Sequence, residues 1–195
     1  MRKKRSTSGF TLIEVVVVVA VIAILAAILT PFIKKYIGDS KVARARNESQ
    51  VIGAAVVNFY KDLARWPNLA AVGGGTVTGL YSGVLGTAAP PTGFNGVGGW
   101  AGLTWDPLWN HLVVNGNNRY PLPTSTLENR WQGSYATQLP LDPWGRPYVI
   151  NAGTFTSAGT RPAPVWVLSA GPNGIIDTSV ASMTTAVDDV GYRIR

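Results

Sequence analysis

The sequence Gly9-Phe10-Thr11-Leu12-Ile13-Glu14 leads into an apolar run in which every residue from Val15 to Leu29 is Val, Ile, Leu or Ala. As an α-helix, residues 10–33 would be roughly 36 Å long at a rise of 1.5 Å per residue. That length is sufficient to cross a hydrocarbon core about 30 Å thick. The run therefore predicts a membrane-spanning helix near the N-terminus.

A basic leader, residues 1–9, precedes this helix and carries four Arg and Lys residues at positions 2–5. Secretory signals are cut after their apolar segment, whereas Gly9 lies before it, so a cut at Gly9 would keep the helix. Loss of the leader would lower the formal charge from +7 to +3, which argues against a nucleic-acid-binding surface. The basic residues also keep the N-terminus cytoplasmic, which places the C-terminal part across the membrane.

Glu14 is an unusual residue for a membrane helix, because a carboxylate costs about 2.5–3.5 kcal/mol near the bilayer centre and less near its edge. A simple signal anchor, the alternative, has no need of it. A cut after Gly9 would create an α-amine at Phe10, which could pair with Glu14 of the same chain or of a neighbour. Because desolvated pairs specify arrangement better than they add stability, Glu14 is predicted to set the register of assembled helices.

The segment Gly9–Glu14, followed by an apolar helix, resembles the N-terminal signal of type IV pilins and pseudopilins. The resemblance implies that prepilin peptidase cuts between Gly9 and Phe10 and methylates the new N-terminal Phe10. It also implies a helix that packs in the core of a filament and is distorted at Pro31. The signal covers the first quarter of the chain and identifies the superfamily, not the member.

Beyond Pro31 the apolar residues become periodic, and residues 34–66 are predicted to continue the helix as an amphipathic segment. The periodic set is Val42, Ala45, Ser49, Ile52, Val56, Phe59 and Leu63. Pro67 disfavours helical backbone at Trp66, so the helix is expected to end there. The stripe is expected to pack against the protein's own sheet, and the length of the helix also suggests a stalk shared with neighbouring subunits.

The composition excludes several kinds of site. The chain has no cysteine and one histidine, His111, which rules out disulfides, thiolate nucleophiles and a multi-histidine zinc site within one chain. Residues 96–101 match a loose dinucleotide-binding pattern but lack the flanking strand and helix, so a surface loop is expected. No nucleophile–base constellation is evident, so we expect no enzymatic activity and assign His111 no role.

Residues 67–130 are rich in Gly and Trp and are interpreted as a variable insertion or a loop between helix and sheet. Trp100, Trp105 and Trp109 cluster within this segment. Tryptophans at this density form either a ligand-stacking surface or a small core beneath a long loop. The core is the simpler interpretation.

Residues 131–195 are predicted to form a small β-sheet. Asp142-Pro143-Trp144-Gly145 has the residue types of a turn. Residues 146–150 and 165–169 are typical of strands, and the turn-prone stretch 151–164 between them predicts a hairpin. We therefore expect an α+β protein, in which a long N-terminal helix, half transmembrane and half amphipathic, packs on a small antiparallel sheet.

Three segments resemble the major, G-type pseudopilin of type II secretion systems. They are Arg65-Trp66-Pro67, the stretch from Trp131 to Tyr148 with its Asp-Pro-Trp-Gly turn, and Leu168–Gly174 followed by Asp188-Asp189-Val190. Residues 76–130 have no counterpart that we can place in that family's pattern. The resemblance implies a pilin-like fold.

The same resemblance implies a calcium ion in the C-terminal loop. Its ligands would be the side chains of Asn173, Asp188 and Asp189 and the backbone carbonyl of Ala170. Asn173 stands where the family carries an acidic residue, and calcium accepts such a neutral oxygen at a cost in affinity. The alternative is a plain turn at Asn173 and a solvated pair of aspartates.

The resemblance implies a structural subunit of a pseudopilus that drives protein export across the outer membrane. A single helix would anchor it in the bacterial inner membrane, with the C-terminal domain in the periplasm. Expected partners are further copies of the chain, minor pseudopilins, prepilin peptidase and an inner-membrane assembly platform. Two alternatives stay open: a type IV pilus pilin for adhesion, motility or DNA uptake, and a membrane-anchored periplasmic enzyme or binding module.

Overall fold

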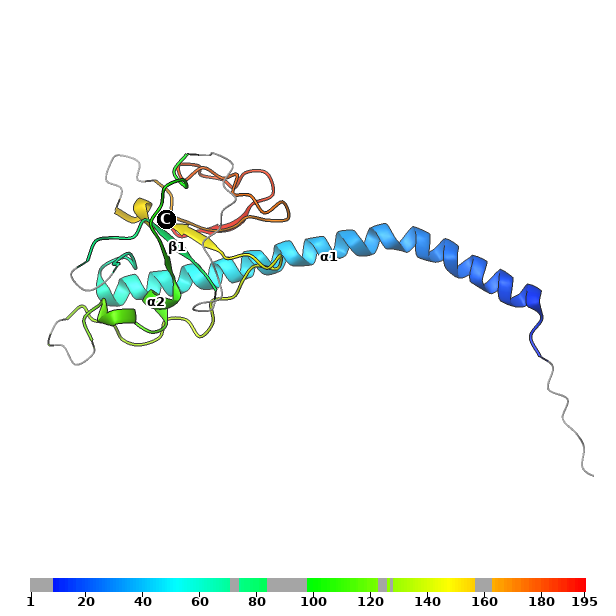
Figure 1. The fold of residues 1–195 in the computed structure, drawn as a ribbon, viewed down its shortest axis with the longest axis horizontal. Coiled ribbons are helices and arrows are strands. Elements are labelled where there is room, and N and C mark those ends of the chain that lie inside the picture. Colours follow the sequence, from blue (N-terminus) through cyan, green and yellow to red (C-terminus); the bar gives the residue numbers. More distant parts are fainter. Residues whose placement is uncertain (1–8, 71–73, 84–97, 123–125, 127, 157–162) are drawn as a thin grey trace, which may run out of the picture. The chain divides into compact units, whose positions relative to one another are not determined.

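The computed structural model describes residues 9–70, 74–83, 98–122, 126, 128–156 and 163–195. Leader residues 1–8, residues 71–73, 84–97, 123–125 and 127 of the Gly- and Trp-rich segment, and residues 157–162 of the expected hairpin loop lie outside the described residues. The dinucleotide-like pattern falls partly outside them, at residues 96 and 97. The chain divides into two compact units, Met1–Ser40 and Lys41–Arg195. One helix, α1 (Leu12–Leu63), contributes residues to both (Figure 1).

In the first unit, the large apolar side chains of α1 are all more than half exposed. Among the described residues, α1 is the one helix long and apolar enough to cross a membrane. Pro31 lies inside α1 without interrupting it. Because proline has no N–H, the carbonyl of Ala27 loses its helical donor, and the hydroxyl of Thr30 donates to the Ala26 carbonyl at 2.6 Å.

In the second unit, the C-terminal half of α1 buries one face against the rest of the unit. The buried residues are Ala45, Ser49, Ile52, Gly53, Ala55, Val56, Phe59 and Leu63, and Val42 packs against them half-buried. The predicted stripe is therefore confirmed. The helix ends at Leu63, slightly before Trp66, because Ala64 adopts a left-handed conformation with φ of 50°.

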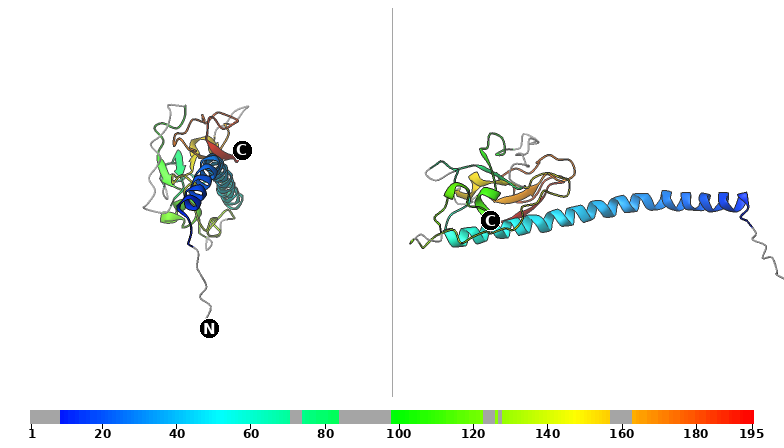
Figure 2. Two further views of the ribbon diagram at one scale, coloured as in Figure 1. Left: turned by 90° about the vertical axis from the view of Figure 1, so that its right-hand side faces the viewer. Right: turned by 60° about the horizontal axis from the view of Figure 1, so that its bottom comes forward.

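The sheet has five short strands in the order β2-β1-β3-β4-β5 and lies along one side of the C-terminal half of α1 (Figure 1, Figure 2). The strands are β1 (Gly79–Tyr81), β2 (Trp105–Pro107), β3 (Val149–Asn151), β4 (Trp166–Ser169) and β5 (Val190–Arg193). The predicted hairpin is present as β3 and β4, which pair antiparallel with Ile150 opposite Val167.

The prediction of a purely antiparallel sheet is wrong for one pair, because β1 and β2 run parallel. A parallel pair needs a long connection to bring the chain back to the same end of the sheet, and residues 82–104 are long enough to provide one. Residues 67–130 therefore supply two strands together with α2 (Trp109–Leu112) and the 3₁₀ turn η1 (Gly116–Asn118). These elements are built into the sheet and its flank.

Both faces of the sheet are buried. Ile150 and Val167 face the main core with α1, whereas Val149 and Leu168 face a second, smaller core. Trp100 lies in that smaller core at 1% exposure, and its indole N–H donates to the Thr178 carbonyl at 2.7 Å. The interpretation of the tryptophans as core residues is confirmed for Trp100.

Two further contacts connect distant parts of the second unit. The hydroxyl of Tyr148, next to β3, donates to Glu48 of α1 at 2.7 Å. Another 3₁₀ turn, η2 (Ala152–Thr156), follows β3 and carries Phe155, whose ring stacks on Trp66 with centroids 4.7 Å apart. The helix and the sheet thus share one core and a set of specific contacts.

Candidate functional site

The predicted processing point lies just outside the first turn of α1. Gly9 and Phe10 have non-helical backbone, and Phe10 is 89% exposed. Exposed, non-helical segments are the preferred places for proteolytic cleavage. The local structure is therefore compatible with cleavage between Gly9 and Phe10.

Glu14 takes part in a capping box at the start of α1. The backbone N–H and the hydroxyl of Thr11 both donate to Oε2 of Glu14 at 2.8 Å. A Thr at the N-cap and a Glu three residues later satisfy each other and the free N–H groups of the first helical turn. The spacing of Thr11 and Glu14 is the signal in the sequence from which this cap could have been predicted.

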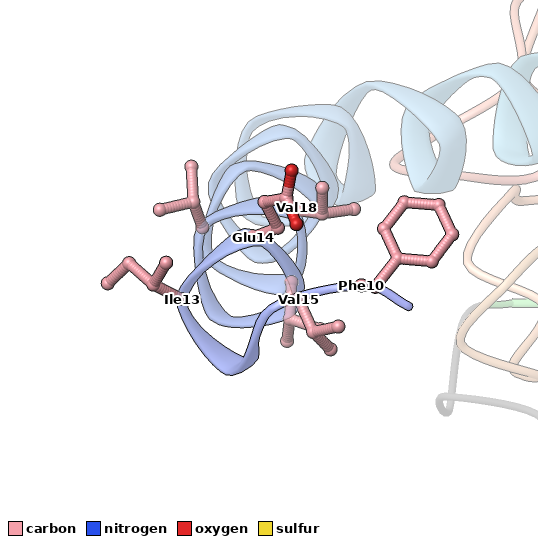
Figure 3. A pocket seen from close by; sticks show the side chains of 7 residues that line it. Phe10, Ile13, Glu14, Val15 and Val18 are labelled. Carbon is pink, nitrogen blue, oxygen red and sulfur yellow. The ribbon is translucent and has the colours of Figure 1, made fainter. Parts of the chain in front are cut away.

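An apolar groove surrounds this carboxylate on the surface of the helix. It measures about 620 Å³ and is lined by Phe10, Ile13, Glu14, Val15 and Val17–Val19 (Figure 3). Both Thr11 bonds fall on Oε2, and Oε1 has no hydrogen-bond partner among the described residues. A partner that covers the groove must therefore bring an apolar surface and a donor or cation for Oε1.

The C-terminal loop gathers the residues expected to bind calcium. The Asn173 N–H donates to Oδ2 of Asp188 at 2.8 Å. The N–H groups of Asp177 and Thr178 donate to Oδ2 of Asp189 at 2.9 and 2.7 Å. Asn173 and Asp188 are thus in contact across 15 residues of sequence, and Asp189 is bonded to the backbone of Asp177 and Thr178.

The side chain of Asn173 is engaged differently from the expectation. Its Oδ1 accepts from the Ile175 N–H at 2.7 Å, and its Nδ2 donates to Asp177 at 2.9 Å. Asp177 is therefore a fourth polar residue of the loop, and it was missed from the sequence. An aspartate four residues after Asn173 was the available signal.

Two carboxylate oxygens make this loop a reasonable site for a cation. Oδ1 of Asp188 and Oδ1 of Asp189 are buried and have no hydrogen-bond partner in the part of the chain that the structure describes. Burial raises the pKa of Asp189, and the nearby charge of Asp177 acts in the same direction, against the hydrogen bonds from Thr178 and Asp177. Asp189 is only 6% exposed, so its carboxylate is largely removed from solvent.

The described residues contain no group of three acidic or histidine side chains placed to hold a metal ion. Backbone carbonyls would have to supply the remaining ligands. The Ala170 carbonyl accepts from the Gly174 N–H at 3.1 Å and has a second lone pair. Calcium takes six to eight mixed oxygen ligands, so this donor set fits calcium better than smaller or softer ions.

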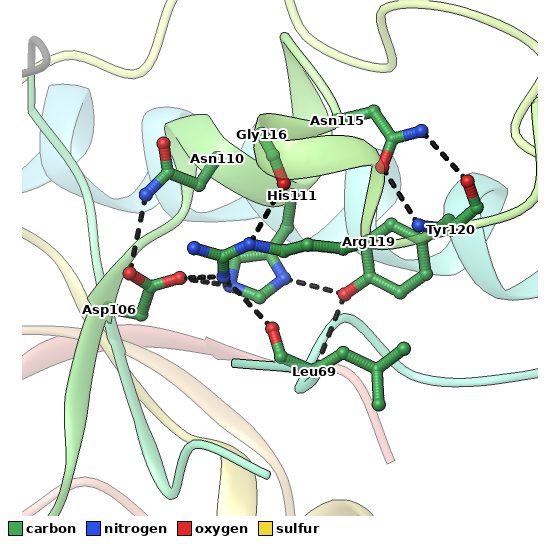
Figure 4. A network of polar contacts seen from close by, with 8 residues as sticks. All are labelled: Leu69, Asp106, Asn110, His111, Asn115, Gly116, Arg119 and Tyr120. Carbon is green, nitrogen blue, oxygen red and sulfur yellow. Dashed lines mark hydrogen bonds and ion pairs between the residues drawn. The ribbon is translucent and has the colours of Figure 1, made fainter. Parts of the chain in front are cut away.

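A second polar cluster surrounds His111 in the buried flank of the sheet (Figure 4). Its Nε2 lies 2.8 Å from Oδ2 of Asp106, and its Nδ1 lies 2.6 Å from the hydroxyl of Tyr120. Because the Asp106 carboxylate only accepts, the ring carries its proton on Nε2 and Nδ1 accepts from Tyr120. Arg119 also donates to Asp106 and, at 2.9 Å, to the Leu69 carbonyl.

This cluster has the connectivity of a proton relay but serves as a structural link. Tyr120 is 1% exposed and His111 is fully buried, so no substrate reaches either group. Burial lowers the pKa of His111, which Asp106 opposes and Arg119 reinforces. The cluster joins β2, α2, η1 and the segment after α1, a role that the sequence did not indicate for His111.

Comparison with known proteins gives two family matches. Residues 4–30 match the prokaryotic N-terminal methylation motif, and residues 119–184 match protein G of the type II secretion system. Core protein G of the type II secretion system from Pseudomonas aeruginosa is 27% identical over 172 residues, 88% of each chain. No solved structure gives a significant match.

Pilins match shorter parts of the chain. The fimbrial protein EcpC of Eikenella corrodens is 41% identical over 96 residues, which are 48% of this chain and 61% of EcpC. The major fimbrial protein FimA of Dichelobacter nodosus is 45% identical over 53 residues, or 27% of this chain and 34% of FimA. The chain thus matches less than two thirds of the length of these pilins.

Proposed function

Because this chain is a type IV pilin-like protein, homologous to core protein G of type II secretion systems and to type IV pilins, we propose that it is a subunit of a type II secretion pseudopilus. Such a subunit is processed by prepilin peptidase, anchored in the inner membrane and polymerised into a filament. The supporting observation is coverage: the similarity to protein G extends over 88% of the chain. The similarity to FimA covers 27% of it.

The second candidate is a subunit of a surface pilus. The local identity of 41% to EcpC, higher than the 27% to protein G, favours it. Deletion of the gene in the source bacterium separates the two, with the intact gene restored as the control. We expect loss of exoprotein secretion while surface pili persist; loss of surface pili with normal secretion would contradict the proposal.

The groove and Glu14 support a specific mode of assembly. After cleavage, the α-amine of a neighbouring subunit's Phe10 would supply the cation that Oε1 of Glu14 lacks, and apolar side chains of neighbouring helices would cover the groove. Neighbouring helices that cover the groove would shield its apolar side chains from lipid, and the charge pair would join two subunits at one position. Together these contacts would fix the axial register between subunits. Further copies of the chain, minor pseudopilins and an inner-membrane assembly platform are the proposed partners.

We also propose that the C-terminal domain lies in the periplasm. The leader charges and the single apolar helix support this orientation. The chain has no cysteine, so a Met183→Cys variant carries one thiol, and Met183 is 53% exposed. We expect a membrane-impermeant maleimide to label it in spheroplasts; labelling only after lysis would contradict the orientation.

Calcium binding is the remaining part of the proposal. Asp188, Asp189, the Ala170 carbonyl and Asn173 would hold the ion, with Asp177 close by. Bound calcium would neutralise the buried carboxylates and fasten the loop onto the sheet.

Calorimetric titration of the full chain in mild detergent tests calcium binding. We expect heat with the parent protein and none with the Asp188→Ala, Asp189→Ala double variant. Glu128→Ala, which removes an exposed carboxylate outside the loop, is the matched control and should bind as the parent does. Absence of heat in the parent would remove calcium from the proposed function.

A further inference from the structure

The Asp-Pro-Trp-Gly turn has a buried acidic side chain at its centre. The Asp142 side chain is fully buried, and its Oδ1 accepts from the N–H groups of Trp144 and Arg146 at 3.0 and 2.8 Å. Its Oδ2 accepts from the hydroxyl of Ser169, at the end of β4, at 2.6 Å. The turn is therefore locked internally and tied to the strand that leads into the C-terminal loop.

Gly171 is held on both sides by this turn. Its N–H donates to the Ser169 hydroxyl at 3.2 Å, the hydroxyl that is itself bonded to Asp142. Its carbonyl accepts from the guanidinium group of Arg146. The two links fix the peptide planes on either side of Gly171, and the Ala170 carbonyl belongs to the first of those planes.

The glycines of the loop leave room for these contacts. Gly171 has a φ of 56°, and the backbone of Asp188 occupies the place where a side chain would start. Gly174 has a φ of 81°, and the guanidinium group of Arg146 fills the corresponding place there. Arg146 and Asp188 thus both lie against the 170–174 segment.

We propose that Asp142, Ser169 and Arg146 are positioning residues for the C-terminal loop. Through their contacts with Gly171 they orient the Ala170 carbonyl and keep Asp188 in position to bind calcium. This inference rests on the proposed calcium site and assigns a role to the Asp-Pro-Trp-Gly turn. Groups that orient metal ligands from behind typically change metal affinity 10- to 100-fold when they are removed.

Arg146 allows a test in which two physical effects have opposite signs. A cation close to a calcium ion repels it, so loss of the Arg146 charge alone would tighten calcium binding. Loss of the contact with the Gly171 carbonyl would free the peptide and weaken binding. The sign of the change in affinity therefore decides between a positioning role and a purely electrostatic one.

The experiment is calcium titration of the full chain in mild detergent, with the parent and four variants. Arg146→Met removes the charge and the contact, and Arg146→Lys keeps the charge. Ser169→Ala removes the link to the Gly171 N–H with a small change in volume. Lys61→Gln removes a positive charge in the last turn of α1, outside the loop, and is the control.

We expect Arg146→Met and Arg146→Lys to bind calcium at least tenfold more weakly, Ser169→Ala to bind several-fold more weakly, and Lys61→Gln to match the parent. Equal or tighter binding by both Arg146 variants would overturn the positioning role while leaving the calcium site in place. A parent that takes up no calcium would overturn the calcium part of the proposed function, and the positioning role with it.

A second readout separates positioning from general destabilisation. In EDTA, hydrogen exchange at the N–H groups of Gly171 and Asn173 should be faster in the Arg146 and Ser169 variants, while exchange in β3 is unchanged. Faster exchange throughout the sheet would mean that the variants have lost stability as a whole, and it would overturn a specific role of the turn. Ser169→Ala carries this test if the Arg146 variants do not fold.

Discussion

Thr11 and Glu14 satisfy each other at the start of α1, where the Thr11 hydroxyl and N–H both donate to Oε2 of Glu14 at 2.8 Å. Glu14 therefore has two separable properties, a hydrogen-bonding role in the helix cap and a negative charge. A glutamine at the same position keeps the capping geometry, since the capping box accepts Glu or Gln.

The first prediction separates these properties. Glu14→Gln should abolish filament assembly, because the neutral amide cannot pair with a neighbour's α-amine. Thr11→Ala should still assemble, although loss of the cap costs about 1 kcal/mol of helix stability. Shearing and pelleting of filaments measures assembly, and membrane levels of each variant control for insertion. Normal filaments from Glu14→Gln would show that the cap, not the charge, is what assembly requires.

The second prediction concerns the buried ion pair between Arg119 and Asp106. Asp106→Ala leaves the nearly buried Arg119 without its counter-charge, so the free energy of unfolding should fall by about 3–5 kcal/mol. All seven tryptophans lie between Trp66 and Trp166, so their fluorescence in a urea titration reports on the second unit.

The matched control for Asp106→Ala is Glu128→Ala, which removes an exposed carboxylate and should change stability by less than about 0.5 kcal/mol. A change of similar size in both variants would contradict the assignment of Asp106, His111 and Arg119 as a structural link.

The third prediction is a dependence of stability on pH. The groups that face His111 are Asp106, Arg119 and Tyr120, and burial is the largest cause of its lowered pKa. The unfolded chain, with an ordinary histidine pKa of about 6.5, binds this proton more readily than the folded chain. Stability should therefore be complete above that pH and decline as the pH falls below it.

A His111→Gln variant should lose part of this dependence. Thermal unfolding of both proteins between pH 5 and 8 measures it, because carboxylates elsewhere contribute equally to the two curves. Parallel curves would show that His111 does not carry the effect. The pKa of Asp106 is also lowered in the folded protein. It adds a separate loss of stability below about pH 4, the ordinary pKa of an aspartate, because the unfolded chain then binds the proton more readily.

The fourth prediction concerns Val187, which precedes the two aspartates of the loop. It has a φ of 51° and an exposure of 85%, so its side chain gains no packing to offset the left-handed backbone. Left-handed backbone costs an L-residue roughly 1–2 kcal/mol. Val187→Gly should relieve most of this cost and raise the melting temperature in EDTA, whereas Gly174→Val, at a φ of 81°, should lower it. A lower melting temperature for Val187→Gly would mean that the valine side chain itself is required.

Local sequence signals were sufficient for a large part of this structure. The apolar run, the stripe from Ala45 to Leu63 and the strands around Ile150 and Val167 depend on periodicity or residue type within a short window. Each is confirmed in α1, β3 and β4. The N-terminal signal, from Gly9 to Glu14, likewise needs no knowledge of the fold.

The remaining features depend on partners that are distant in sequence. The parallel pairing of β1 with β2 is set by where a long connection returns, and three-residue strands have too few residues to show alternation. Arg119 bonds the Leu69 carbonyl, 50 residues earlier, and Arg146 bonds the Gly171 carbonyl, 25 residues later. A single sequence contains no period or spacing that reports such contacts.

The hydrogen bond from Tyr148 to Glu48, together with the burial of α1 against β3, β4 and β5, has a consequence for biosynthesis. The amphipathic half of α1 is translated well before the strands that cover it, which come much later in the sequence. Contacts across such separations form slowly, because the intervening chain must lose its freedom first. The amphipathic half of α1 therefore stays uncovered until these strands have been translated, and a chain that stops before Val190 lacks the edge strand against which Gly53 packs.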